Sequence, residues 1–200
     1  IVFSAEDAQE WCDAGETEVE NVYINATGSD AVDLSCIETI TGYLEIENSN
    51  APSIDLSGVT SIGDELYIHE NDDLETIDLM GLVEVGSYIQ ISGNSSLEQV
   101  YLDSLETADS YFYVQNNDQL EALELSSLLS VSSTFYFYEN QNLSEVSAPV
   151  LEEIGGSLTG AQSLPRRHTL LPRRREVPAV QLCSVPSRIV TYLQPAHQES

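Results

Sequence analysis

A repeat with a fixed step is the feature that most constrains how this chain folds. Apolar residues mark the same position in five successive copies: Leu66, Ile89, Phe112, Phe135 and Leu158. After each of the first four marks, apolar residues recur two and eleven positions on, Asn five positions on and Leu eight positions on. No helix has this period. The pattern is typical of a solenoid, in which each copy forms one coil that stacks on its neighbours.

The same layout extends towards the N-terminus with a step that is one position shorter. One coil begins at Leu44 and an earlier one at Val22, so six coils are readable, and a seventh begins at Leu158. Each coil begins with two apolar residues on either side of one outward position, which indicates a short β-strand because strand side chains alternate between faces. The sequence therefore predicts an all-β, parallel solenoid of about six coils, each about 22–23 residues long, formed by residues 19–160.

Residues 1–18 are expected to cap the open end of this stack. The residues Ser-Ala-Glu-Asp that begin at Ser4 resemble a capping box, so residues 4–12 are predicted to form a short helix. A solenoid without a cap exposes the apolar side chains of its last coil. Trp11 is our candidate for covering them. The chain begins at Ile1 without Met, and we expect an upstream segment to precede it.

Two cysteines, Cys12 and Cys36, flank the first coil. We expect a disulfide between them that joins the cap to the stack and stabilises the fold by about 3 kcal/mol. Two free buried thiols are the alternative. No Cys or His cluster has the spacing of zinc ligands, and Cys183 has no evident partner in the sequence.

Charge divides the chain into two parts. All six basic residues lie beyond Gln162, whereas the part of the chain up to Gln162 holds all but two of the 34 acids. Such a body repels nucleic acid and anionic lipid, so neither is expected as a partner. Cations and basic partners match its charge, and a surface adapted to salt is the alternative interpretation. No apolar run reaches the roughly 20 residues of a membrane span, so direct membrane insertion is not expected.

The repeat fails in the C-terminal segment, residues 161–200. From Ser163 onwards the chain contains every Arg, five of the seven Pro and no Asp. The next coil would need an apolar residue at position 160 and Asn near position 163, and the sequence has Gly160 and Ser163. We interpret this irregular segment as a shifted reading frame or a read-through. An Arg- and Pro-rich tail that folds back on the acidic body is the alternative.

Tyrosine is concentrated at the outward positions of the first strand. Eight of the ten tyrosines share this face, and only Tyr101 and Tyr192 lie elsewhere. The eight are Tyr23, Tyr43, Tyr67, Tyr88, Tyr111, Tyr113, Tyr136 and Tyr138. Strand propensity favours Tyr, but it does not explain why the second strand has only one. Because Tyr offers rigid amphipathic contact area, we predict a face that binds a protein or glycan ligand. A purely stabilising aromatic ladder is the alternative.

The second strand has an acidic outward position in most coils. Like charges at inter-strand spacing repel each other, and a bound cation would relieve this repulsion. Asp33, Asp55 and Asp78 are therefore candidates for binding Ca²⁺, although they lack the ligand-rich loop of a typical calcium site. No other cofactor is expected.

Three glycosylation sequons occur, at Asn25, Asn94 and Asn142. Asn94 also belongs to the Asn position of the repeat, where side-chain amides are expected to bond to one another and to the backbone of the turn. We therefore expect Asn94 to be engaged in the stack. Asn25 and Asn142 are the candidate glycan acceptors.

The segment from Cys36 to Ile46, which reads Cys-Ile-Glu-Thr-Ile-Thr-Gly-Tyr-Leu-Glu-Ile, resembles the opening of receptor L-domains. Later repeats, such as residues 66–86 with their final apolar–Gly pair, are similar to that family too. The resemblance covers residues 4–160. It implies a right-handed β-helix, a secreted or cell-surface location, and ligand binding in place of catalysis, as in fungal cell-wall relatives and receptor tyrosine kinases. The family's Cys-rich module and kinase segment are missing, so receptor-type signalling is not implied.

Three classes of function are compatible with these observations. A non-enzymatic, secreted or cell-surface recognition module that uses the tyrosines is the leading hypothesis. A structural repeat of a cell wall or matrix, with an acidic cation-binding face, is the alternative. An enzyme acting on polysaccharide is the third. Lyases of acidic glycans need a basic residue, and the coils offer only His69. Hydrolases need two carboxylates at a set separation, and among so many acids no pair stands out.

Overall fold

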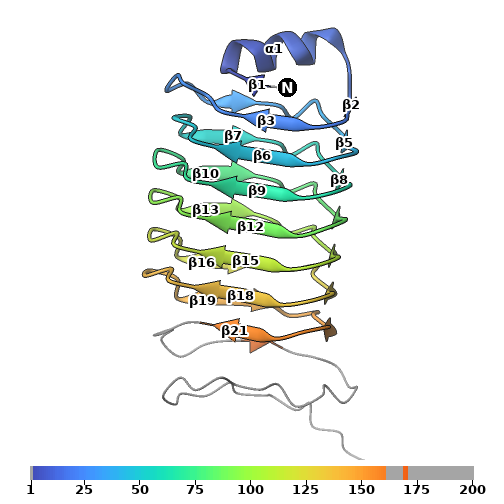
Figure 1. Cartoon of the computed structure of the whole chain (residues 1–200), viewed down its shortest axis with the longest axis vertical. Coiled ribbons are helices and arrows are strands. Elements are labelled where there is room, and N and C mark those ends of the chain that lie inside the picture. The colour runs from blue at the N-terminus through green and yellow to red at the C-terminus, as the bar shows by residue number, and fades with distance from the viewer. Residues whose placement is uncertain (1, 161–168, 171–200) are drawn as a thin grey trace, which may run out of the picture.

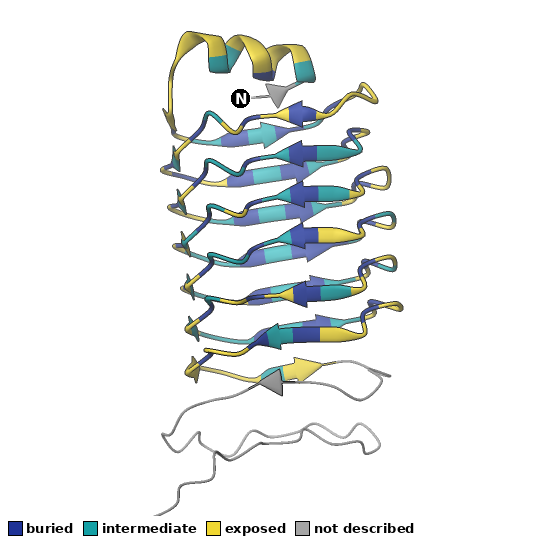
Figure 2. Cartoon of the chain, turned by 180° about the vertical axis from the view of Figure 1, so that it is seen from behind, coloured by how far each residue is buried: buried dark blue, intermediate teal, exposed yellow. Residues whose placement is uncertain are grey.

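The computed structural model describes residues 2–160 and 169–170 of the chain. It is a parallel β-solenoid of about six coils with one helix over its N-terminal end (Figure 1). The coils wind in a right-handed sense (Figures 1 and 2). The predicted fold class is therefore confirmed.

The first strands of successive coils form an eight-stranded parallel sheet. Its members are β1 (Val2–Phe3), β3 (Val22–Ile24), β6 (Leu44–Glu47), β9 (Leu66–His69), β12 (Ile89–Ser92), β15 (Phe112–Gln115), β18 (Phe135–Tyr138) and β21 (Leu158–Gly160). Leu66 pairs with Leu44 on one side and with Ile89 on the other. This register confirms that the repeat positions stack directly on one another.

The second strands form two smaller parallel sheets on the opposite side of the solenoid. One contains β4 (Val32–Asp33), β7 (Ser53–Asp55), β10 (Thr76–Asp78) and β13 (Gln99–Tyr101). The other contains β16 (Ala122–Glu124), β19 (Glu145–Ala148) and β22 (Thr169–Leu170).

Each coil also has a short third strand, which the sequence analysis did not predict. These strands form a seven-stranded sheet of β2 (Glu18–Val19), β5 (Thr39–Ile40), β8 (Ser61–Ile62), β11 (Glu84–Val85), β14 (Thr107–Ala108), β17 (Ser130–Val131) and β20 (Glu153–Ile154). A strand this short has only one inward side chain, so it leaves no alternating pattern in the sequence.

The inward ladders form one continuous core along the solenoid. Inward positions of the first strands are buried and outward positions are mostly half-buried, as the bands along the strands show (Figure 2). Phe112 and Phe135 stack on each other with their ring centroids 5.1 Å apart. Burying a large apolar side chain contributes about 1.5–3 kcal/mol, so these ladders are the main source of stability.

The turn after the first strand is held by a ladder of buried asparagines. Its members are Asn71, Asn94, Asn117 and Asn140. The Asn94 Nδ2 donates to the Ile68 carbonyl and to the Asn117 Oδ1, both at 3.0 Å, while the Asn94 Oδ1 accepts from the Asn71 backbone N–H at 3.1 Å. Each amide thus links its own turn to the neighbouring coils, as the sequence analysis expected.

The N-terminal cap is the helix α1 (Ala5–Ala14). Ser4 and Asp7 form the predicted capping box: the Ser4 Oγ accepts from the Asp7 backbone N–H at 3.2 Å, and Asp7 accepts from the Ser4 backbone N–H at 3.0 Å. Gly15 ends the helix in the left-handed conformation, with φ of 74°. Ala8 is the buried residue of the helix, and Trp11, the candidate for covering the first coil, is half-buried and packs against the core.

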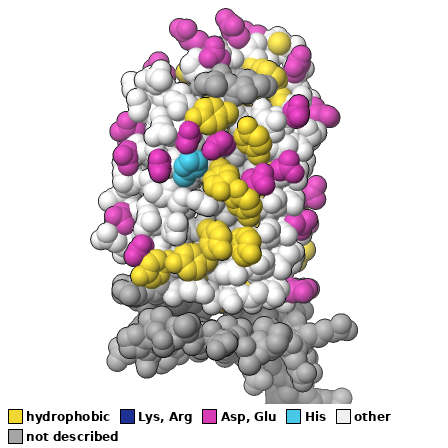
Figure 3. Space-filling view, in the orientation of Figure 1, with side chains coloured by type: hydrophobic (Ala, Val, Ile, Leu, Met, Phe, Trp, Pro, Cys, Tyr) yellow, Lys and Arg dark blue, Asp and Glu magenta, His cyan; other side chains and the backbone are white. Residues whose placement is uncertain are grey.

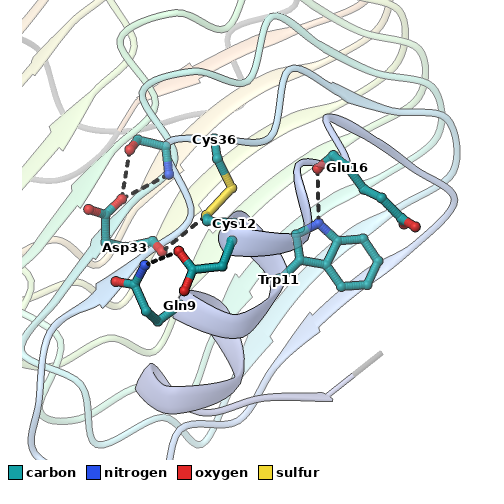
Figure 4. The surroundings of a disulfide bond; sticks show 8 residues. Gln9, Trp11, Cys12, Glu16, Asp33 and Cys36 are labelled. Atoms are coloured by element: carbon teal, nitrogen blue, oxygen red, sulfur yellow. Dashed lines mark hydrogen bonds between the residues drawn. A yellow bond between two sulfur atoms is a disulfide. The ribbon is translucent and has the colours of Figure 1, made fainter.

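A disulfide joins this cap to the first coil (Figure 4). It links Cys12 at the end of α1 to Cys36, and their Cα atoms lie 5.6 Å apart. The bond therefore attaches the covering helix to the stack that it shields.

At the other end, the seventh coil begins as predicted. Its strand β21 pairs with β18, with Leu158 opposite Phe135. The structure adds one further strand, β22, which pairs with β19 and places Thr169 opposite Ser147. The stack of second strands thus extends to residues 169–170, beyond Leu158, the last apolar position of the repeat. The rest of the Arg- and Pro-rich tail, including Cys183, lies outside the described residues.

No helix among residues 2–160 and 169–170 is long and apolar enough to span a membrane.

Candidate functional site

The outward surface of the eight-stranded sheet carries the eight predicted tyrosines, and we call it the tyrosine face. Tyr67, Tyr113 and Tyr136 occupy one central column of this sheet, whose other members are Val2, Tyr23, Glu45, Gln90 and Thr159. From Tyr23 to Thr159, this column brings together residues from seven successive coils. This follows from the period of the repeat, because side chains one coil apart stack at inter-strand spacing.

Six of the eight rings of the tyrosine face pack against each other in two clusters. In the upper cluster, Tyr67 contacts Tyr88 edge-on at a centroid distance of 4.9 Å and His69 at 5.5 Å. The lower cluster runs from Tyr111, which stacks on Tyr113 at 5.4 Å, to Tyr136 and Tyr138. Contacts of this kind hold the rings in place, since aromatic pairs add about 0.5–1.5 kcal/mol beyond area burial.

This packing leaves substantial ring area in contact with solvent. Tyr43 and Tyr111 are 37% and 42% exposed, and the other six tyrosines are half-buried. Figure 3 shows the result as a diagonal band of apolar and aromatic side chains on this face, with acidic side chains around it. A band of this kind is preformed, because its rings are already ordered by their neighbours.

Three hydroxyls of this face, those of Tyr23, Tyr88 and Tyr136, have a raised pKa, which favours the protonated form. Burial raises the pKa of Tyr88 well above its usual range, and a hydrogen bond with Tyr67 adds to the shift. Burial also raises the pKa of Tyr136. A hydrogen bond to the Glu47 carboxylate raises the pKa of Tyr23. At neutral pH these phenols therefore remain hydrogen-bond donors as well as acceptors.

Between Tyr23 and Tyr67 lies a cluster that the sequence analysis did not identify, formed by Glu45, Glu47 and His69. The His69 Nε2 lies 3.2 Å from the Glu45 Oε1 and 3.5 Å from the Glu47 Oε2. The Tyr23 hydroxyl donates to the Glu47 Oε1 at 2.6 Å. The histidine of Figure 3 sits beside these acidic side chains. We call this group the Glu–His cluster.

The signal for the Glu–His cluster was present in the sequence. Glu47 and His69 lie one coil apart and are therefore register partners, while Glu45 faces Tyr67 in the adjacent position. The sequence analysis considered His69 only as the basic residue of the coils and did not compare outward positions on neighbouring strands. Reading diagonal neighbours on adjacent strands would have found the group, because long side chains reach across such diagonals.

The acidic row of the second strand is placed as predicted, with Asp33 opposite Asp55 and Asp55 opposite Asp78. Each carboxylate, however, accepts a hydrogen bond from the backbone N–H two positions further on, at 2.9 or 3.0 Å. Hydrogen bonds from the hydroxyl and backbone of Ser35 lower the pKa of Asp33. This local bonding gives the row a role in forming turns. In the described part of the chain, the one group of three acidic, His or Cys side chains with converging ligand atoms is the Glu–His cluster.

The sequon asparagines differ in their surroundings. Asn94 is buried in the turn ladder. Asn142 is exposed, and its Nδ2 lies 3.4 Å from the Gln119 Oε1. Asn25 is half-buried, and its Nδ2 lies 3.4 Å from the Tyr23 hydroxyl. A glycan on Asn25 would therefore stand at the edge of the tyrosine face, whereas one on Asn142 would project from a loop.

Comparison with protein-family models, with curated proteins and with solved structures finds no match to this chain.

Proposed function

We propose that this protein is a non-enzymatic recognition module that binds a protein or glycan ligand through the tyrosine face. One observation carries the proposal: eight of the ten tyrosines lie on a single sheet face and are partly open to solvent, and six of their rings pack against one another. Tyr and Trp supply large, rigid contact area at low entropic cost, which is why they dominate binding surfaces.

The chemistry of the face fits ligands with both apolar and polar groups. Rings such as Tyr43 and Tyr111 offer solvent-exposed edges and faces for sugar rings or apolar side chains. Protonated hydroxyls donate hydrogen bonds, and surrounding carboxylates accept them. The negative charge around the face favours a neutral or basic ligand over an acidic one.

A secreted or cell-surface location is part of the proposal. The disulfide between Cys12 and Cys36 supports it, since such bonds persist in oxidising compartments. The resemblance of residues 36–46 to receptor L-domains supports it as well, together with the parallel solenoid fold that this resemblance implied.

The alternative of a cation-binding structural repeat depends on the acidic row of the second strand. The carboxylates of Asp33, Asp55 and Asp78 are already engaged with backbone N–H groups of their own turns. The recognition module is therefore the better-supported function.

The test is a binding screen of the full chain on arrays of neutral and basic glycans and of extracellular proteins. The variant Tyr67→Ala/Tyr113→Ala/Tyr136→Ala removes the three central rings, which are half-buried outward residues whose loss leaves the inward core ladders intact. We expect any wild-type ligand to lose most of its affinity, because interface aromatics contribute about 2 kcal/mol or more each when truncated.

The matched control is Tyr101→Ala, which removes a tyrosine from the second strand on the other side of the solenoid. We expect this variant to bind the ligand with the same affinity as the wild type. A ligand that binds the triple variant and the wild type equally well would show that the tyrosine face is an aromatic ladder with a purely stabilising role.

A further inference from the structure

We propose that Glu45, Glu47 and His69 form a binding site for a single transition-metal ion of the Zn²⁺ class, between Tyr23 and Tyr67 of the tyrosine face. Three ligand atoms already converge there: His69 Nε2, Glu45 Oε1 and Glu47 Oε2 all lie within 4.8 Å of one another. They come from two neighbouring strands of the same sheet, β6 and β9, whose register fixes their separation.

The distances fit a metal of this size. Zn²⁺ binds His nitrogen and carboxylate oxygen at about 2.0–2.2 Å in a tetrahedron, which places neighbouring ligand atoms about 3.3 Å apart. The observed separations from His69 Nε2 are 3.2 Å to Glu45 Oε1 and 3.5 Å to Glu47 Oε2. Both separations match those of a tetrahedral site, and the two carboxylate oxygens lie within 4.8 Å of each other.

The donor set selects the kind of metal. Imidazole nitrogen suits Zn²⁺, Cu²⁺ and Ni²⁺, whereas Ca²⁺ takes six to eight oxygen ligands. Two carboxylates would neutralise the charge of a divalent ion. His69 is the only Lys, Arg or His that precedes Ser163 in the chain, so no other basic side chain of that part competes for these carboxylates. Three protein ligands leave the fourth position of the tetrahedron open to water or to a bound ligand.

Neighbouring groups already orient the ligands. The Tyr23 hydroxyl donates to the Glu47 Oε1, so the Oε2 is the oxygen that faces His69. The Tyr67 ring contacts the His69 imidazole edge-on. Outer groups of this kind fix the geometry of metal ligands, and removing one typically costs about 10–100-fold in metal affinity.

The experiment is a calorimetric titration of the full chain with ZnCl₂ alone, after treatment with a chelator and in the presence of excess Ca²⁺. We expect one saturable Zn²⁺ site that Ca²⁺ does not block. His69→Gln and Glu45→Gln/Glu47→Gln should each abolish it. Circular dichroism of each variant checks that the coils remain folded.

Two further variants distinguish Zn²⁺ binding at this site from non-specific attraction of Zn²⁺ to an acidic protein. Glu84→Gln removes the same charge from the seven-stranded sheet and should leave the affinity unchanged. Tyr23→Phe keeps all three ligands and should weaken binding by about 10-fold or more through the loss of the hydrogen bond to Glu47.

The proposal fails if the wild type has no saturable Zn²⁺ site. It also fails if His69→Gln binds Zn²⁺ as tightly as the wild type, which would assign the ion to His168, His197 or the surface carboxylates instead. Neither result would bear on ligand binding by the tyrosine face, since the array screen uses different variants.

Discussion

At the scale of single residues, the coils are joined by side chains that replace backbone hydrogen bonds at the turns. The residue after each first strand adopts a positive φ in five coils: Asn48, Glu70, Gly93, Asn116 and Glu139. The next residue is then the buried Asn of the ladder in four of these coils, and Ser49 takes its place in the fifth. The ladder satisfies carbonyl and N–H groups that the sharp turn would otherwise leave buried without partners.

We predict that Asn117→Ala lowers the free energy of unfolding by roughly 2–4 kcal/mol, because it leaves several buried polar groups without partners. The Asn117 Nδ2 donates to the Ile91 carbonyl at 2.9 Å, and its Oδ1 accepts from the Asn94 backbone at 3.2 Å. Urea unfolding measures the change. The exposed Asn142→Ala is the control and should be near neutral, and equal effects of the two variants would refute a stabilising role for the ladder.

The raised pKa of Tyr88 predicts a loss of stability at alkaline pH. A tyrosine whose pKa is raised by folding contributes stability that is fully present below its unfolded pKa of about 10 and is lost as pH rises through the folded pKa. Thermal unfolding at increasing pH should therefore show a falling Tm above that point. Tyr88→Phe should flatten this decline, and an unchanged slope would show that burial of this phenol is not its cause.

At the scale of secondary-structure elements, each first strand has one face in the core and one face in the site. Phe135 and Tyr136 are adjacent in β18, yet Phe135 is fully buried and Tyr136 lies on the tyrosine face. The strand therefore contributes to stability and to recognition through different side chains.

We predict that Phe135→Ala lowers stability by about 3–5 kcal/mol, since it creates a cavity between coils. Tyr136→Ala in the same strand should cost less, about 1–2 kcal/mol, because it removes the ring contacts with Tyr113 and Tyr138 but opens no cavity in the core. Chemical denaturation of the two variants compares them directly. Similar losses would mean that the two residues do not alternate between core and surface.

The disulfide is expected to help hold helix α1 on the first coil. Replacing Cys12 and Cys36 together by Ala should lower stability by about 3 kcal/mol, because the bond closes a loop in the unfolded chain and so reduces the entropy of the unfolded state. Thermal unfolding with and without the replacement measures this loss. Cys183→Ala leaves the bond intact and is the control. A double variant as stable as the wild type would show that the helix caps the stack without the bond.

At the scale of the whole molecule, the repeat accounts for what could be predicted from sequence. Its fixed step identified the stack, its register and the tyrosine face, because stacking turns sequence separation directly into spatial contact. The capping box and the Cys12–Cys36 pair were equally visible as local signals.

Other features depend on contacts that a linear pattern does not display. The short third strands have one inward residue each, so no alternation marks them. The Glu–His cluster arises from a diagonal between β6 and β9 and depends on the side-chain conformations of Glu47 and His69. The local engagement of Asp55 was hidden for a related reason, since its partner is the backbone N–H of Ser57.

If side chains one coil apart in the sequence meet on one face, proton–proton NOEs connect the tyrosine rings of neighbouring coils. In the full chain with ring-labelled tyrosine, we expect NOEs between Tyr113 and Tyr136, whose ring centroids lie 5.5 Å apart, and between Tyr67 and Tyr88. We expect none from Tyr101 to any of these four rings. NOEs from Tyr113 that reach Tyr111 but not Tyr136 would contradict the stacking register and, with it, the tyrosine face.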